Sequence, residues 1–169
     1  MKKIFQHLVM AVAAMTIFSS CEKEEVKEVY IGGTAPVLSS SVSGSIPLSF
    51  LTQDQPAVKF SWTNPEFEFA SGISSQDVNY TLEIDVTGNG FTGPNKKSVS
   101  ISKDLSASYT QKEFNIVLSD LKLKLNVAAS IDVRLVASLG PNATKLFSNI
   151  LKFLRFFDML CFVFYVTCF

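Results

Sequence analysis

The sequence predicts an all-β domain with one short helix, and three observations support this. Apolar and polar residues alternate along several short segments, which is typical of strands in sheets that pack on one face only. Turn signals rich in glycine, proline and asparagine separate these segments. Residues 111–122 instead carry apolar side chains at helical spacing. About seven short strands with such turns favour an immunoglobulin-like or fibronectin-III-like β-sandwich with one short crossover helix.

The expected strands follow one another from Pro36 onward. Residues 37–43 and 46–51 are weak, serine-rich segments that Gly44 separates. Alternation is clearest in 57–63, which ends at Asn64-Pro65, and in 77–86, while 98–102 and 130–138 complete the series. We expect the apolar faces of these strands to build the core: Val58, Phe60, Trp62, Val78, Tyr80, Leu82, Ile84, Val86, Val99, Ile101, Ile131, Val133, Leu135 and Ala137.

The predicted helix begins at a capping box. In Thr110-Gln111-Lys112-Glu113 the threonine hydroxyl accepts from one free backbone N–H, and Glu113 reaches back to another. We expect residues 111–122 to pack over one end of the sandwich. The apolar stripe that supports this helix consists of Phe114, Val117, Leu118, Leu121 and Leu125.

The first 20 residues have the layout of a secretory signal peptide. Lys2 and Lys3 precede a mostly apolar stretch, 4–18, and Ser19 and Ser20 stand directly before Cys21. A cysteine at the cleavage point indicates a lipoprotein signal. The acylated Cys21 would then bind membrane lipid through several chains, at about 0.8 kcal/mol per buried methylene. The alternative is an ordinary signal peptide followed by an incidental cysteine.

Residues 21–35 are predicted to form a charged tether behind this anchor. Glu22-Lys23-Glu24-Glu25 resembles the surface-export signal of Bacteroidetes lipoproteins, in which a lysine and paired acidic residues follow the lipidated cysteine. The resemblance implies a protein that is lipid-anchored in the outer membrane and exposed at the cell surface. The other interpretation, a solvated linker, is compatible with it.

Composition argues against an enzyme, a cofactor and a nucleic-acid partner. The chain has 15 basic and 15 acidic residues, and no basic patch stands out. The single histidine, His7, lies in the predicted signal peptide, so the mature chain has none for a catalytic triad or a His-ligated zinc site. Glu83 and Asp85 form a carboxylate pair with Asp77 upstream, but alternation points them to solvent. We therefore expect no catalytic and no metal-binding residues.

Two loops and one strand hold the remaining candidate residues. The string 88–93, GNGFTG, has the glycine spacing of a dinucleotide-binding loop, but no helix start follows it, so we interpret it as a turn. Trp62 is a possible sugar platform, yet its place on an apolar strand face favours the core. Phe67 and Phe69, in the loop 65–72, are candidate contacts for a ligand or partner, and the alternative is that they cap an edge of the core.

Several segments, taken in order, resemble one family. They are Ala35-Pro36-Val37-Leu38, residues 60–63, 80–85 with 88–91, Tyr109-Thr110, 113–115, 132–137 and Ser148-Asn149. Together they resemble the N-terminal, immunoglobulin-like domain of SusE/SusF-type outer-membrane lipoproteins, which implies such a domain over residues 36–153. In that family this domain looks like a spacer in lipoproteins that assist glycan uptake. The implied partners are a TonB-dependent transporter complex and, through later domains, a starch-like polysaccharide.

Residues 154–169, LRFFDMLCFVFYVTCF, do not continue this pattern. Residues 150–153 can start the final strand, after which alternation is lost. The uncharged run 159–169 has 11 residues, too few for a membrane span of roughly 20. We favour a reading-frame change near Ile150 that removed later domains. The alternative is an authentic short chain whose tail packs on the sandwich or binds a partner.

These observations favour a non-catalytic spacer over a stand-alone adhesion or protein-interaction module. A β-sandwich by itself does not decide between them, because one fold hosts many functions. Exposed aromatic residues in the loops 65–72 and 88–95 would favour binding, and buried ones would favour the spacer.

Overall fold

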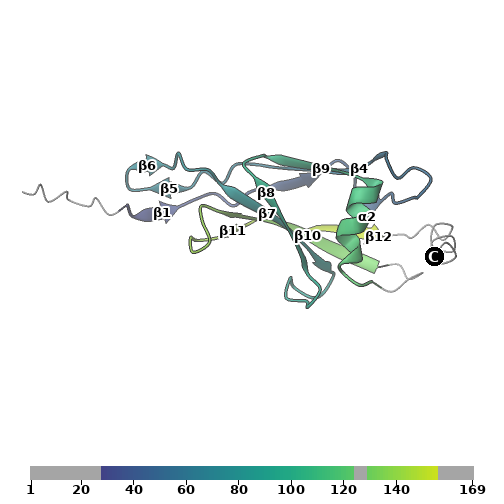
Figure 1. Cartoon of the computed structure of the whole chain (residues 1–169). Coiled ribbons are helices and arrows are strands. Elements are labelled where there is room, and N and C mark those ends of the chain that lie inside the picture. The colour runs from purple at the N-terminus through teal and green to yellow at the C-terminus, as the bar shows by residue number, and fades with distance from the viewer. Residues whose placement is uncertain (1–27, 124–128, 156–169) are drawn as a thin grey trace, which may run out of the picture.

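A computed structural model describes residues 28–123 and 129–155. The predicted signal peptide, Cys21, the residues 22–25 and most of the apolar tail lie outside these ranges, as does Leu125. Within them the chain forms two facing sheets of six and three strands, a third sheet of three very short strands and a helix (Figure 1). The prediction of an all-β sandwich with one short helix is confirmed.

The larger sheet contains the strands that show the clearest alternation. Its order is β3-β12-β10-β7-β8, and β11 pairs with β10 beyond the end of β12. The smaller sheet has the order β2-β4-β9. The bounds in the larger sheet are Gly44–Ile46 for β3, Leu151–Arg155 for β12, Ala129–Ser138 for β10, Asn79–Val86 for β7, Lys97–Ser102 for β8 and Leu146–Phe147 for β11. In the smaller sheet β2 is Leu38–Ser40, β4 is Pro56–Trp62 and β9 is Ser106–Thr110.

The chain changes sheets between β2 and β3. β2 pairs antiparallel with β4 in the smaller sheet, whereas β3 pairs parallel with β12 in the larger one. Gly44 opens β3 with a φ of 77°, a backbone conformation that favours glycine. This switch links the two sheets along one edge of the sandwich.

A small third sheet lies at the end where the described chain begins. It consists of β1 (Tyr30–Gly32), β5 (Glu68–Phe69) and β6 (Gly72–Ile73). β1 lies within residues 21–35, which the sequence predicts as a charged tether, and this short strand was not predicted. The physical reason for the strand is aromatic packing, because the Tyr30 ring contacts both Phe67 and Phe69.

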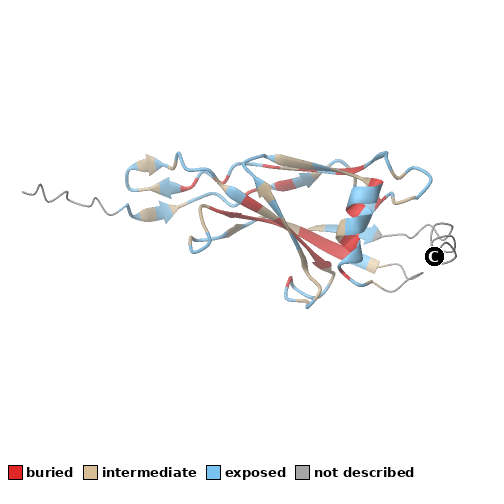
Figure 2. Ribbon diagram, in the orientation of Figure 1, coloured by how far each residue is buried: buried red, intermediate tan, exposed pale blue. Residues whose placement is uncertain are grey.

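The core is made of the apolar faces that alternation predicted (Figure 2). Phe60 is fully buried at its centre, and its ring contacts those of Tyr109, Phe114 and Phe153. Trp62 is only 5 % exposed and packs against Tyr80, so its assignment to the core is confirmed.

The helix α2 spans Gln111–Ser119 and covers one end of the sandwich. Its predicted capping box is present in full. The helix ends before Lys122, where the sequence placed its end. The amides of Leu121 and Lys122 donate to carbonyls only three residues back, and Lys122 has a φ of 49°. These are the marks of a turn that closes the helix.

The predicted strand at 46–51 is wrong. Its backbone turns after Ile46, and residues 47–55 form a loop in which the amide of Gln53 donates to the carbonyl of Phe50. β9 was not predicted, because SASYT carries a weak apolar pattern; its pairing with β4 defines it.

Candidate functional site

Two carboxylates on the polar face of β7 are buried, contrary to the sequence prediction. Glu83 is 8 % exposed and Asp85 1 % exposed, although alternation pointed both to solvent. The correction has a simple cause: the loop 87–96 between β7 and β8 bonds to these two side chains. Alternation therefore identified the polar face correctly but not the loop that covers it.

Asp85 holds the glycine-rich loop. Its carboxylate accepts from the amide of Val86 at 2.8 Å, from Asn89 Nδ2 at 3.0 Å and from the amide of Gly93 at 3.1 Å. A Cβ on Gly93 would lie 2.7 Å from Asp85 Oδ1, so a larger residue cannot approach in this way. Gly88 and Gly90 have φ values of 98° and 61°, which the turn requires. The interpretation of 88–93 as a turn between strands is confirmed by β8, which follows it.

Glu83 lies at the centre of a cluster that we call the ionic clasp: Glu83, Lys96, Arg134, Phe91 and Phe147. Lys96 Nζ and Arg134 both bind the Glu83 carboxylate, with Arg134 Nε 2.8 Å and Nη2 2.7 Å from Oε2. Arg134 is the cross-strand partner of Glu83 in the β7–β10 register. Burial by itself would raise the pKa of Glu83, but the hydrogen bonds and charges of Lys96 and Arg134 outweigh it and lower that pKa.

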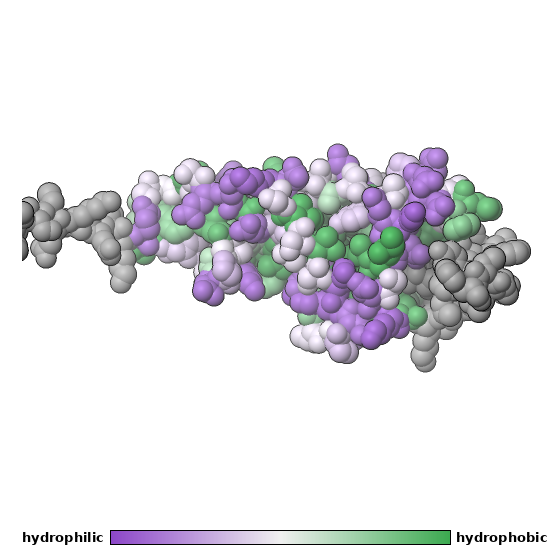
Figure 3. All heavy atoms as spheres, in the orientation of Figure 1, coloured by the Kyte–Doolittle hydropathy of each residue, from purple (hydrophilic) through white to green (hydrophobic). Residues whose placement is uncertain are grey.

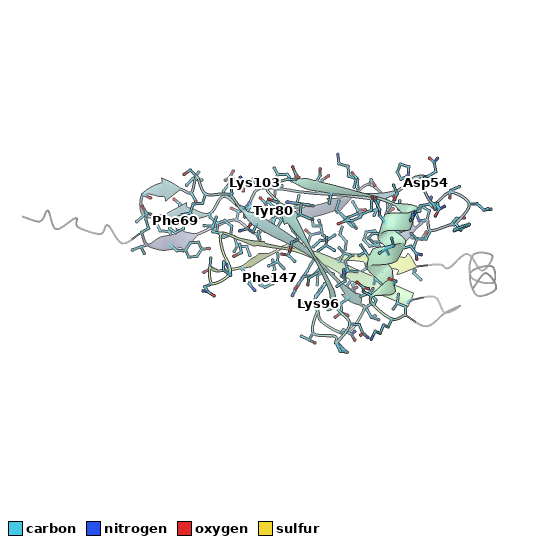
Figure 4. All side chains as sticks on the ribbon, viewed as in Figure 1. Asp54, Phe69, Tyr80, Lys96, Lys103 and Phe147 are labelled. Atoms are coloured by element: carbon cyan, nitrogen blue, oxygen red, sulfur yellow. The ribbon has the colours of Figure 1, made fainter. Side chains whose placement is uncertain are left out.

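Two aromatic rings enclose the Arg134 guanidinium. Its central carbon lies 4.1 Å from the ring centroid of Phe91, in the glycine-rich loop, and 4.5 Å from that of Phe147, in β11. Such contacts are attractive because the π-face of a ring is negative. Phe147 belongs to β11, which pairs with β10, whereas Lys96 directly precedes β8, which pairs with β7. These two side chains, both labelled in Figure 4, therefore come from the two sides of the β7–β10 pair. The clasp thus fastens one loop and one short strand onto the outer face of β7 and β10.

The hydrogen bonds and ion pairs of this face are structural contacts. Each carboxylate accepts hydrogen bonds from neighbouring donors, and Asp132, the register partner of Asp85, accepts from Thr87 Oγ1 at 2.6 Å. A general acid needs a raised pKa at neutral pH, whereas that of Glu83 is lowered. Among the described residues, no group of three or more His, Cys, Asp or Glu side chains is arranged to hold a metal ion.

Of the two candidate loop contacts, Phe67 is buried and Phe69 is half-buried. Phe67 is 2 % exposed and belongs to the core, so the structure does not present its side chain to a ligand. Phe69 is half-buried, with its ring in edge contact with Tyr30 at a centroid distance of 5.8 Å. Phe91, the aromatic residue of the second loop, is buried in the ionic clasp. Phe67 and Phe91 therefore meet the condition that favours a spacer, whereas Phe69 meets it only in part.

Ser148 and Asn149 join the two sheets through hydrogen bonds that the sequence did not predict. The Asn149 side chain accepts from the amide of Leu38 at 2.8 Å and donates to its carbonyl at 3.0 Å, as a neighbouring strand would. Ser148 exchanges two bonds with Leu135: its amide donates to the carbonyl and its Oγ accepts from the amide. Consecutive residues thus bind β10 in the larger sheet and β2 in the smaller one.

Comparison with known proteins decides the family. The family model described as SusE outer membrane protein matches residues 23–136, more than half of the chain. The chain belongs to this family. The match includes β7, most of β10 and most of the ionic clasp, and it confirms the resemblance seen in the sequence. No curated protein and no solved structure gives a significant match.

Membership of the SusE family fixes the coarse function. The protein is an outer membrane component of the Sus starch-utilisation type, and the family is non-enzymatic. Its place is accordingly the outer membrane. In the part of the chain that the structure describes, no helix has the length and apolar character needed to cross a membrane.

Proposed function

We propose that this SusE-family chain is a non-catalytic spacer that is anchored by lipid at Cys21 and faces outward from the outer membrane. One observation carries the proposal. The described chain enters the sandwich through β1 at one end of an elongated body and leaves it through β12 toward the opposite end (Figure 1). A domain with this connectivity separates the segment before it from the segment after it.

The dimensions suit such a role. The seven residues 21–27 span at most about 25 Å when fully extended. The ten-residue strand β10 alone spans about 33 Å. Pairing of β1 with β5 fixes the direction in which the tether joins the body. The bonds of Ser148 and Asn149 hold the segment just before β12 to both sheets.

The export signal, the partners and the substrate belong to the same proposal. Residues 22–25, Glu-Lys-Glu-Glu, would direct the protein to the cell surface in a Bacteroidetes host. There it would stand beside a TonB-dependent transporter complex, with the polysaccharide held by domains on the far side of the spacer. The inward-facing aromatic residues Phe67 and Phe91 support a spacer rather than a sugar-binding module. The half-buried Phe69 stays a proposed contact for a partner.

Fractionation of cells that express the full chain tests the anchor. The parent is expected in the outer-membrane fraction, and Cys21→Ser is expected to leave it. Membrane retention of Cys21→Ser would show that lipid is not the anchor. Replacing Glu24 and Glu25 together by alanine is expected to protect the protein from protease added to whole cells, with no change in fractionation. Unchanged protease sensitivity would refute the export signal.

Affinity electrophoresis in gels that contain starch tests the spacer function itself. We expect the full chain to migrate as it does in a gel without starch. Retardation by the polysaccharide would refute the spacer and favour a binding module.

A further inference from the structure

Two neighbouring apolar side chains project into solvent from the loop 47–55, which joins β3 to β4. Phe50 is 51 % exposed and Leu51 85 % exposed. We call these two residues the distal patch. The loop lies at the end of the body that carries α2, where Figure 4 labels Asp54, and apolar surface is visible at this end in Figure 3. Leu48, in the same loop, instead packs against the core.

The loop is held in place, so the exposure of the patch is not the result of a loose segment. Gln111, the buried first residue of α2, accepts through Oε1 from the amide of Ser49 at 2.8 Å and from Thr52 Oγ1 at 3.0 Å. The amides of Gln111 and Lys112 donate to carbonyls of the loop at 3.0 Å and 2.9 Å. Four bonds therefore fix the backbone on both sides of Phe50 and Leu51, and this backbone directs them outward.

The chain leaves the last described strand beside this loop. β3 and β12 run parallel, and their final register pair is Ile46 with Arg155. Phe50 follows Ile46 by four residues, which span at most about 14 Å. The segment after Arg155 therefore starts within reach of the distal patch.

We propose that residues 156–169 dock on the distal patch. The segment FFDMLCFVFYVTCF is apolar except for Asp158 and Thr167, and its 14 residues reach up to about 46 Å when extended. Contact between the two removes apolar surface of both from water, which is favourable. The proposal commits the patch to this segment rather than to a second copy of the chain or to lipid. It does not rest on the lipid anchor or on the spacer function. Of the two interpretations of the tail, it adopts the authentic segment that packs on the sandwich.

Cys161 and Cys168 make the proposal measurable, because both lie in the docking segment. The full chain, in isolated membranes, is labelled with a maleimide, and the modification of each cysteine is read by mass spectrometry of its peptide. We expect both thiols to react at least about tenfold more slowly than in the same chain unfolded by denaturant, since labelling follows the population of undocked segment. Reaction of the parent at the unfolded rate would overturn the proposal.

Matched variants separate docking from other kinds of protection. Leu51→Asp is expected to raise both labelling rates about tenfold, because an aspartate removes the apolar contact. Leu51→Met is expected to keep the protection. The control Ile73→Asp makes the same kind of change at a side chain that is 69 % exposed in β6, at the opposite end of the body, and is expected to leave the rates unchanged.

Two results would assign the segment elsewhere and overturn the proposal. Protection that survives both Leu51→Asp and Phe50→Asp would show that lipid or another surface covers the cysteines. Protection that falls on dilution of detergent-solubilised protein would show that a second copy covers them. Thermal unfolding of each variant, followed by circular dichroism, is expected to match the parent, and a labelling increase that appears only with loss of folding would also count against docking.

Discussion

Arg134→Met tests whether the ionic clasp stabilises the fold. The substitution keeps most of the aliphatic side chain but removes the charge, the bonds to Glu83 and the stacking between Phe91 and Phe147. Hydrogen bonds to a charged group contribute about 1.5–3 kcal/mol, and each ring contact adds about 0.5–1 kcal/mol. The Arg134 and Lys96 side chains are 23 % and 28 % exposed, so solvent screens their charges. The lower end of the sum therefore applies, about 2–3 kcal/mol.

Urea unfolding followed by fluorescence measures this loss. Trp62 is the only tryptophan and is buried in the core, so its emission reports unfolding of the whole sandwich. With a slope of about 2 kcal/mol per molar urea, the midpoint is expected to fall by about 1–1.5 M. The matched control is Lys103→Met, which breaks an ion pair with Asp77 between two largely exposed side chains. It is expected to cost less than about 0.5 kcal/mol. Equal midpoints for the two variants would refute the stabilising role of the clasp.

Three further predictions concern individual contacts. The pKa of Glu83 is lowered below its ordinary value of 4.5, so its contribution to stability is present above that pH and is lost as the pH falls through the folded pKa. The difference in unfolding free energy between the parent and Glu83→Gln is therefore expected to shrink in acid. A constant difference from pH 7 to pH 2 would contradict this. Gly93→Ala is expected to destabilise the domain by about 1–3 kcal/mol, because its Cβ would lie 2.7 Å from Asp85 Oδ1. In the control Gly140→Ala the Cβ meets open space, and the variant is expected to be near neutral. Similar melting curves for the two variants would argue against the close approach at Gly93. Asn149→Ala leaves the backbone of the buried Leu38 without two bonds and is expected to cost about 1–2 kcal/mol in urea unfolding, with the exposed Asn142→Ala as the control.

The fold could be predicted where one local pattern decides the structure. Alternation placed Val58, Phe60 and Trp62 on one buried face, and a four-residue motif placed the start of α2 at Gln111. The end of α2 escaped prediction because the apolar stripe continues through Leu121 while the backbone already turns. The strand β1 escaped because three residues carry no periodicity, and contacts of Tyr30 with a distant loop define it.

The site was harder to predict because the burial of its side chains depends on a loop that folds over them, and alternation within a strand does not reveal such a loop. Period-two spacing shows that Glu83 and Asp85 share a face, but it contains no information about the loop that folds over them. That information lies in the bond from Gly93 to Asp85 and in the position of Phe91 over Arg134. A polar strand face next to a glycine-rich loop, with an arginine on the neighbouring polar face of 130–138, was the available signal. No signal in the sequence indicated the structural role of Asn149, because its bonds reach Leu38 across 111 residues of sequence.

Depth-dependent quenching tests the spacer function most directly. In a full chain that carries Cys161→Ser and Cys168→Ser, a fluorophore is attached through Ile73→Cys in β6 or through Asp54→Cys in the loop beside α2 (Figure 4). Both positions are exposed. Membranes that contain nitroxide-labelled lipid then quench whichever probe lies close to the surface. The spacer function predicts strong quenching at position 73 and little at position 54. Equal quenching at the two positions would show that the body lies flat on the membrane and would contradict the proposal that it lifts its distal end away from the surface.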